Sequence, residues 1–115
     1  MTHYDWNQMP LEQLNPLVSR RAIHTPGLTI ARLEIRKGAE VPEHRHVHEQ
    51  VANVERGSLE FWFGAERLVV SGGQSVAIPS NVPHRVVALE DTVVVDVFTP
   101  CRQDWIQGDD SYLRK

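Results

Sequence analysis

The stretch His44-Arg45-His46-Val47-His48-Glu49-Gln50 carries the clearest structural signal in the sequence. Within it His44, His46, His48 and Gln50 recur at a spacing of two residues. If the segment is extended, all of these side chains project from one face, and imidazoles gathered on one face indicate a metal site. A transition metal also needs a ligand from a separate segment, and His84, which follows a proline-rich turn, is the candidate.

Short runs rich in Val, Ile, Leu and Phe continue on both sides of this stretch, separated by Gly, Pro, Asn or charged residues. This pattern is typical of all-β folds, and no long helical periodicity competes with it. We therefore expect a small sandwich or barrel over residues 17–98. Its strands are predicted near residues 18–24, 28–36, 42–46, 50–55, 58–63, 67–70, 75–78, 85–89 and 92–98.

The first 16 residues differ from the barrel. They carry apolar side chains with no clean period, namely Tyr4, Trp6, Met9, Leu11 and Leu14. A barrel this small has little interior in which to bury them, so we expect an arm that lies across a partner subunit in a homodimer.

Residues 99–115 form the other end of the chain. Thr99 is a suitable helix N-cap, Pro100 suits the first helical position, and Gly108 is a suitable stop. A short helix with Arg102 in its first turn is predicted, and an irregular tail is the alternative.

Size and composition exclude several classes of protein. The chain has 115 residues and a mass of 13.1 kDa, which suits one domain. Its net charge is -3, with 12 basic and 15 acidic residues interspersed, which argues against nucleic-acid binding. No apolar run approaches the roughly 20 residues of a membrane helix, and no secretory signal is visible at the start. The single cysteine, Cys101, cannot form an internal disulfide, so we expect a cytoplasmic protein.

The predicted strand 92–98 places a carboxylate on an apolar face. Val94, Asp96 and Phe98 share one face of this strand because side chains alternate. A buried carboxylate needs a hydrogen bond, a cation or a catalytic role. Arg102 follows four residues after Phe98. A structural ion pair between Asp96 and Arg102 and a catalytic pair are both consistent with the sequence.

Two motifs resemble those of the cupins. The first cupin motif reads G-x5-H-x-H-x3,4-E-x6-G, and the corresponding residues here are Gly38, His44, His46, Gln50 and Gly57. The second motif reads G-x5-P-x-G-x2-H-x3-N, and here its places are taken by Gly73, Pro79, Asn81, His84 and Ala88. The resemblance implies a double-stranded β-helix, the jelly-roll barrel of cupins. Asn81 stands where the motif has glycine, in a turn where a positive φ is expected, and asparagine tolerates that conformation.

Gln50 is the main departure from the first motif. A neutral amide leaves the charge of a divalent metal uncompensated, which favours anionic oxygen ligands and suits isomerisation more than oxygenation. The alternative is that Gln50 does not bind the metal and that three histidines hold it alone.

The stretch 44–50 and the ending 96–105 resemble the pectin-degradation cupins of the KdgF family. That resemblance implies metal ligation by His44, His46, Gln50 and His84. Histidine and amide ligands suit one divalent transition metal, zinc, nickel, iron or manganese, and do not choose among them. It also implies functional roles for the residues of a D-x-F-x-x-x-R motif, Asp96, Phe98 and Arg102.

The activity implied by the resemblance is the conversion of 4,5-unsaturated monouronates to a linear keto acid. In that scheme Asp96 moves the proton, Arg102 holds the substrate carboxylate and Phe98 packs against the ring. Two alternatives remain: a metal-dependent cupin oxygenase or isomerase acting on another small molecule, and a non-catalytic cupin that binds a sugar.

Overall fold

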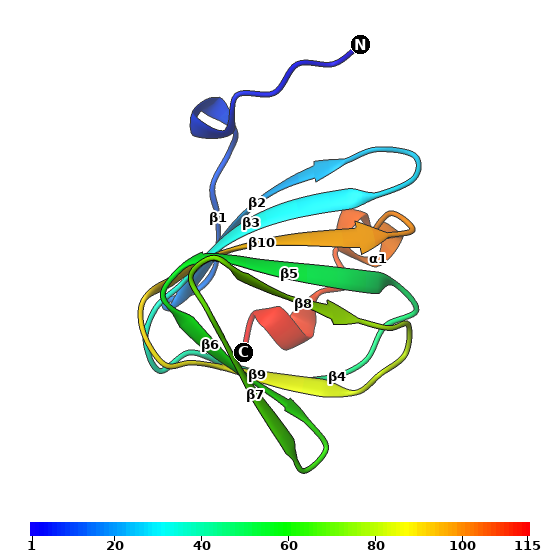
Figure 1. The fold of residues 1–115 in the computed structure, drawn as a ribbon. Coiled ribbons are helices and arrows are strands. Elements are labelled where there is room, and N and C mark those ends of the chain that lie inside the picture. Colours follow the sequence, from blue (N-terminus) through cyan, green and yellow to red (C-terminus); the bar gives the residue numbers. More distant parts are fainter.

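The computed structural model describes residues 1–115 as two antiparallel sheets that face each other (Figure 1). The larger sheet contains, in spatial order, β1 (Glu12–Asn15), β2 (Val18–His24), β3 (Thr29–Ile35), β10 (Thr92–Thr99), β5 (Glu49–Arg56) and β8 (Gln74–Ile78). The smaller sheet contains β4 (Glu40–His44), β9 (His84–Ala88), β6 (Ser58–Phe63) and β7 (Glu66–Ser71). This is the jelly-roll barrel that the sequence predicts.

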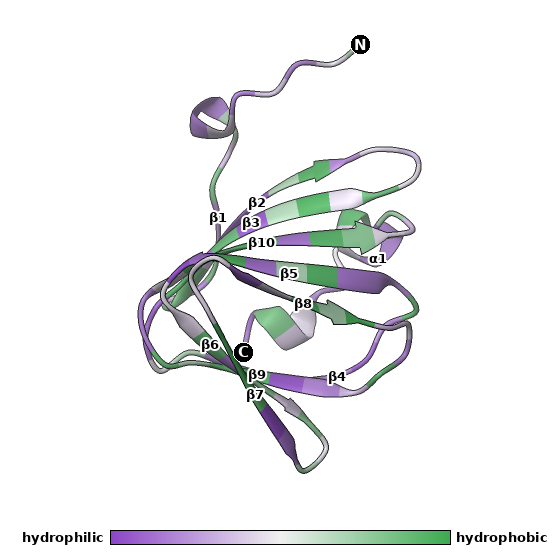
Figure 2. Ribbon diagram, in the orientation of Figure 1, coloured by the Kyte–Doolittle hydropathy of each residue, from purple (hydrophilic) through white to green (hydrophobic).

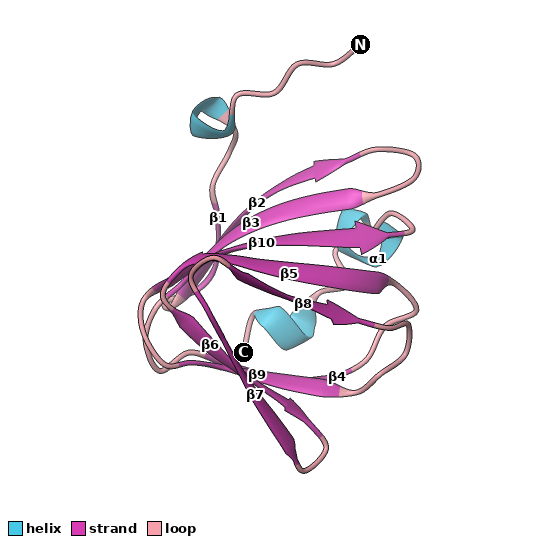
Figure 3. Cartoon of the chain, viewed as in Figure 1, coloured by secondary structure: helices cyan, strands magenta, loops and turns pink.

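Three helical turns lie outside the sheets (Figure 3). They are η1 (Trp6–Gln8), α1 (Gln103–Ile106) and η2 (Ser111–Leu113). The longest has only four residues, so none of them could reach across a bilayer.

The core forms because alternate residues of each strand point between the sheets. In β3 the buried positions include Ala31, Leu33 and Ile35, and in β5 they include Ala52 and Val54. Hydrophobic and hydrophilic residues accordingly alternate as coloured bands along the strands (Figure 2). The barrel interior is thus mostly apolar, and the polar side chains of Gln50, His84 and Asp96 take inward positions at one end.

The predicted strands are present, with shifts at their ends. The strand expected over residues 42–46 is β4, which ends at His44, so the backbone of His46 lies in the connection to β5. One strand, β1, was not predicted. Only Leu14 of its four residues is buried, so the sequence shows no alternation there.

The helix start predicted at Thr99 is wrong. Thr99 ends β10, where it pairs with Glu49 of β5, and α1 begins at Gln103 with Arg102 as its N-cap residue. Thr99, which the sequence pattern predicted to be a helix N-cap, is therefore the last residue of a strand. Gly108 does follow the helix, with a left-handed φ of 82°, as expected of a stop.

Residues before β1 extend away from the barrel (Figure 1). A hydrogen bond from Arg21 Nε to the carbonyl oxygen of Met9 (3.3 Å) ties this segment to β2. Tyr4 and Leu11 are 42% and 47% exposed. The last part of the expected arm, residues 12–15, instead pairs with β2 of its own chain.

Candidate metal centre

The candidate site lies at one end of the barrel, where both sheets direct polar side chains inward. Gln50 in β5 pairs with Phe98 in β10, and Asp96 pairs with Ala52 one inward position further along. In the smaller sheet His44 of β4 pairs with His84 of β9. The turn before β9 is shaped by Asn81, whose φ of 63° confirms the left-handed conformation expected for it.

His44, His46 and His84 form a cluster whose nearest ring nitrogens all lie within 4.8 Å of one another. In each ring Nδ1 lies at hydrogen-bond distance from a backbone carbonyl oxygen: Pro42 for His44 (2.8 Å), His48 for His46 (2.9 Å) and Val82 for His84 (2.8 Å). Because a carbonyl only accepts hydrogen bonds, each Nδ1 carries the proton and each Nε2 offers a lone pair.

The cluster fits a divalent transition metal. His46 Nε2 is buried and has no hydrogen-bond partner in the protein, which is costly unless a ligand takes it. Burial, and then the neighbouring imidazoles, lowers the pKa of His44 to about 4, and burial lowers that of His46 to about 4. Both rings are therefore neutral at pH 7, the form that binds metals. Three neutral imidazole nitrogens suit zinc, nickel or iron.

His48 does not belong to the cluster. The sequence pattern grouped it with His44, His46 and Gln50 on one strand face, but the chain bends between β4 and β5. His48 is buried, and its Nε2 lies 4.0 Å from a carboxylate oxygen of Asp104. The expectation of a common face for all four side chains is therefore wrong, because the segment is not one extended strand.

Asp96 is buried beside the cluster, on the inward face of β10 with Val94 and Phe98, as the alternation of side chains predicts. Its Oδ1 atom is buried and has no hydrogen-bond partner. Burial raises the pKa of this carboxyl to about 7, although the Gln50 amide and the Arg102 guanidinium both act in the opposite direction. The carboxyl is thus poised between its two protonation states near neutral pH.

Arg102 is 1% exposed and lies over the rings of Phe98 and Trp105, with its Cζ atom 4.7 and 4.4 Å from their centroids. Its Nε and Nη2 atoms donate to the two carboxylate oxygens of Asp104, at 3.0 and 2.9 Å. Its Nη1 atom is buried without a partner. Arg102 therefore pairs with Asp104 rather than with Asp96, and the structural ion pair between Asp96 and Arg102 is not formed.

These groups line one cavity of about 50 Å³, whose polar wall consists of His44, His46, Gln50, Asp96, Arg102 and Tyr112. An adjoining pocket of about 190 Å³ is lined by His44, His46 and Arg102 together with Arg45, Asp104, Asp109 and Tyr112. The inner cavity suits an ion with its nearest ligand atoms, and the outer pocket suits a small polar molecule.

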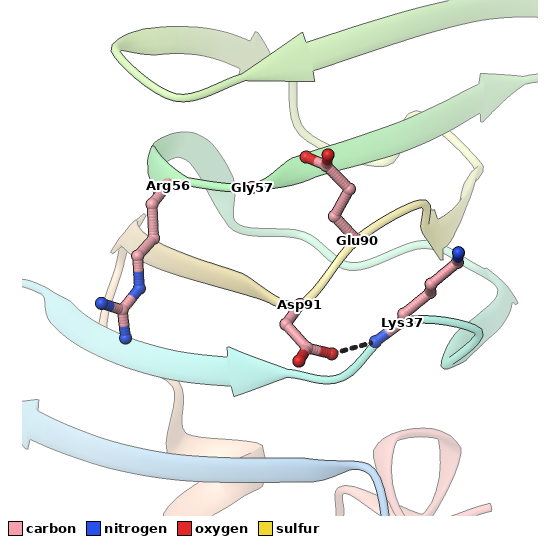
Figure 4. Close-up of a pocket in the computed structure, with 5 residues that line it drawn as sticks. All are labelled: Lys37, Arg56, Gly57, Glu90 and Asp91. Atoms are coloured by element: carbon pink, nitrogen blue, oxygen red, sulfur yellow. Dashed lines mark hydrogen bonds between the residues drawn. The ribbon is translucent and has the colours of Figure 1, made fainter.

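A larger hollow lies at the opposite end of the barrel, between the turns that precede β4, β6 and β10 (Figure 4). Its lining residues are Lys37, Arg56, Gly57, Glu90 and Asp91, and its charged members are all exposed. Asp91 already accepts a hydrogen bond from the Lys37 backbone N–H (2.8 Å). No buried polar atom there lacks a partner, so the end with the histidines is the better candidate site.

Two residues of this end were not found from the sequence. Asp104 orients Arg102, and Tyr112 of η2 stacks on His44 with ring centroids 4.4 Å apart. Asp104 lies two residues after Arg102, and this short spacing between opposite charges could have predicted their ion pair. Tyr112 stands alone in the tail, and no pattern pointed to it.

Comparison with known proteins agrees with this geometry. Residues 31–98 match the family model of the cupin domain. The chain is 31% identical over 103 residues to the pectin degradation protein KdgF of Dickeya dadantii (strain 3937), covering 87% of this chain and 94% of that protein. The structure of KdgF from Halomonas sp. is also similar, with a TM-score of 0.84 and 29% identity over 90% of this chain and 99% of that one.

An RmlC-like cupin from Shewanella frigidimarina NCIMB 400 is similar to the same extent in structure. Its TM-score is 0.84 at 26% identity, covering 91% of this chain and 96% of that one. Since the family model covers more than half of the chain and the KdgF relatives cover nearly all of it, this chain belongs to the cupin domain family and is a relative of KdgF.

Proposed function

We propose that this chain is a metal-dependent enzyme that converts 4,5-unsaturated monouronates, released in pectin or alginate breakdown, to the linear keto acid 4-deoxy-L-threo-5-hexosulose uronate. Its similarity to pectin degradation protein KdgF supports the substrate class. The observation that carries the proposal is one cavity lined by Asp96, His44, His46 and Arg102, in which Asp96 Oδ1 and Arg102 Nη1 have no hydrogen-bond partner; His84 completes the histidine cluster beside it.

Binding is assigned to groups of both pockets. Arg102 Nη1 is a buried cationic donor with no protein acceptor, and a uronate carboxylate would satisfy it. Phe98 is 2% exposed in the cavity wall, where its ring would pack against the sugar. The outer pocket of about 190 Å³ matches a single sugar ring better than an oligosaccharide.

His44, His46, His84 and Gln50 would hold one divalent transition metal, zinc, nickel, iron or manganese. When bound, such an ion would supply Lewis acidity beside an oxygen that gains negative charge. Gln50 is 7% exposed and lies in the same cavity wall, so its amide oxygen is available as the fourth ligand.

The reaction is an isomerisation that needs no oxidant. A proton leaves the anomeric hydroxyl, and the bond between the anomeric carbon and the ring oxygen breaks. The ring oxygen then becomes the keto oxygen as C4 gains a proton. Asp96 is the group proposed to take the first proton and to return one to C4, since no protein donor occupies its Oδ1 atom.

The test is the loss of ultraviolet absorbance of the unsaturated uronate when catalytic amounts of protein of known metal content are added. We expect faster decay than in buffer, loss of that acceleration on chelation, and recovery when the metal is returned. Unchanged decay with metal bound would contradict the proposal. Oxygen uptake by an iron-loaded sample would then favour an oxygenase, and a ligand bound unchanged for hours would favour a binding protein.

We also propose that the chain forms a cytoplasmic homodimer in which residues 1–11 of each copy lie against the other. The exposed Tyr4 and Leu11 side chains and the weak attachment of this segment to its own barrel support the dimer. The unpaired Cys101 supports a reducing compartment.

A further inference from the structure

The C-terminal turn η2 brings an aromatic residue from outside the barrel motifs into the site. Figure 1 shows this turn, in red, in the opening between the two sheets, and Leu113 is part of the core. Asn15 Nδ2 donates to the Leu113 carbonyl oxygen (3.0 Å), and Arg20 Nη2 donates to Asp110 Oδ2 (2.8 Å). Contacts on both sides therefore fix the turn and its central residue, Tyr112.

The ring of Tyr112 lies against the cluster of His44, His46 and His84. It stacks on His44 with ring centroids 4.4 Å apart and an interplanar angle of 28°. Tyr112 is also in the wall of both the inner cavity and the outer pocket. Its side chain therefore stands where a molecule in the outer pocket meets the metal ligands.

The hydroxyl of Tyr112 has an unused proton. Arg102 Nη2 donates to this oxygen at 2.9 Å, and Trp105 Nε1 donates to it at 3.3 Å. A guanidinium and an indole N–H have no acceptor atoms, so in both bonds the hydroxyl is the acceptor. Its own O–H is not donated to any protein acceptor. A phenol that accepts twice and donates to nothing in the protein has its O–H free for a ligand in the adjoining pocket.

We propose that Tyr112 is a further substrate-binding residue that donates its O–H to an oxygen of an anionic sugar acid, beside the guanidinium of Arg102. This inference rests on the proposed function and adds the residue that recognises a substrate oxygen next to the carboxylate. The two donors come from one hydrogen-bonded pair, so they present a fixed spacing that selects a carboxylate with an adjacent oxygen.

The first test is calorimetric binding of D-galacturonate, a saturated uronate that does not react, to the metal-loaded protein and to its Tyr112→Phe variant. The phenyl ring keeps the stacking on His44, so metal affinity should stay the same. Loss of one hydrogen bond should weaken uronate binding by about tenfold. Tyr4→Phe, which removes a hydroxyl from an exposed residue of the N-terminal segment, is the matched control and should bind as the wild type does.

A second variant separates donation to the ligand from support of Arg102. With 3-fluorotyrosine at position 112 the hydroxyl is a stronger donor and a weaker acceptor, so tighter uronate binding supports the inference. Binding that is equal or weaker overturns it, as does a Tyr112→Phe protein that binds like the wild type. If the wild type binds no uronate at all, the proposed substrate class fails and this inference fails with it.

Discussion

At the scale of single residues, hydrogen bonds to the backbone orient the three clustered histidines. His44, His46 and His84 each direct Nδ1 to a carbonyl oxygen, so their Nε2 atoms are the ones presented to a metal. His48 shares the spacing of these residues in the sequence but is turned toward Asp104. Position in the fold, and not spacing alone, decides which histidines can ligate.

A pair of histidine variants tests this distinction. His46→Ala removes one of three clustered nitrogens, and we expect metal affinity to fall by at least about tenfold. His48→Ala, two residues away and equally a loss of one imidazole, should retain the metal. Equilibrium dialysis followed by elemental analysis measures both. Equal metal loss in the two variants would show that His48 ligates and that the cluster is wrongly assigned.

At the scale of elements, the turn between β5 and β6 depends on close approach to the turn before β10. Gly57 has a φ of 88°, and a Cβ atom there would overlap with the Asp91 carbonyl oxygen and with Thr92. Gly64 has a similar φ of 62°, but nothing lies near the place of its Cβ atom. Substitution at Gly64 therefore tests backbone strain alone, whereas substitution at Gly57 tests backbone strain together with steric overlap.

Alanine at each position should give different losses of stability. Gly64→Ala carries only the cost of a left-handed backbone, about 1 kcal/mol in the free energy of unfolding. Gly57→Ala adds the overlap, and we expect a loss on the order of 3 kcal/mol. Urea denaturation measures both values. Similar losses would mean that the β5–β6 turn can move away from Asp91.

The C-terminal turn is held by ion pairs that titrate in acid. Burial opposes ionisation of Asp110, but hydrogen bonds from Arg114 and Arg20 outweigh it and lower the pKa of this carboxyl. A lowered pKa in the folded state means that Asp110 stabilises the fold above the ordinary pKa of about 4 and that this contribution is lost as the pH falls below that value.

The variant Asp110→Asn should therefore lower the melting temperature at pH 7 and have a smaller effect as the pH is lowered toward 3. The free energy of unfolding at pH 7 should fall by on the order of 3 kcal/mol, because the buried charge of Arg20 then has one partner fewer. Thermal unfolding across this pH range measures the difference. A constant difference between the two proteins would contradict the role given to this carboxylate.

Most strands, and the grouping of His44, His46 and His84, were predictable from local sequence patterns. The inward face of β10 with Asp96 and Phe98 is an example. The helix start was not predictable, because Thr99 is held by pairing with Glu49 across the sheet. Tyr112 was not predictable for the same reason. Its turn is held by hydrogen bonds from Asn15 and Arg20, which lie far away in the sequence.

At the scale of the whole molecule, residues 1–11 extend away from the barrel and leave apolar side chains exposed. Deleting residues 1–11 should convert a dimer to a monomer, because it removes the exposed apolar side chains proposed to contact a second copy. Light scattering coupled to size-exclusion chromatography gives the mass of each form. A full-length monomer, or a dimer unaffected by the deletion, would exclude the exchanged arm.

The proposed chemistry lies at the end of the barrel that holds the histidines, and it depends on the buried carboxyl of Asp96, whose Oδ1 atom has no hydrogen-bond partner. The most direct measurement compares wild type and Asp96→Asn at equal metal content in the uronate absorbance assay. The amide is the same size as the carboxyl and cannot take the proton, so we expect turnover at least about 100-fold slower with the metal still bound. Turnover at the wild-type rate would contradict the account.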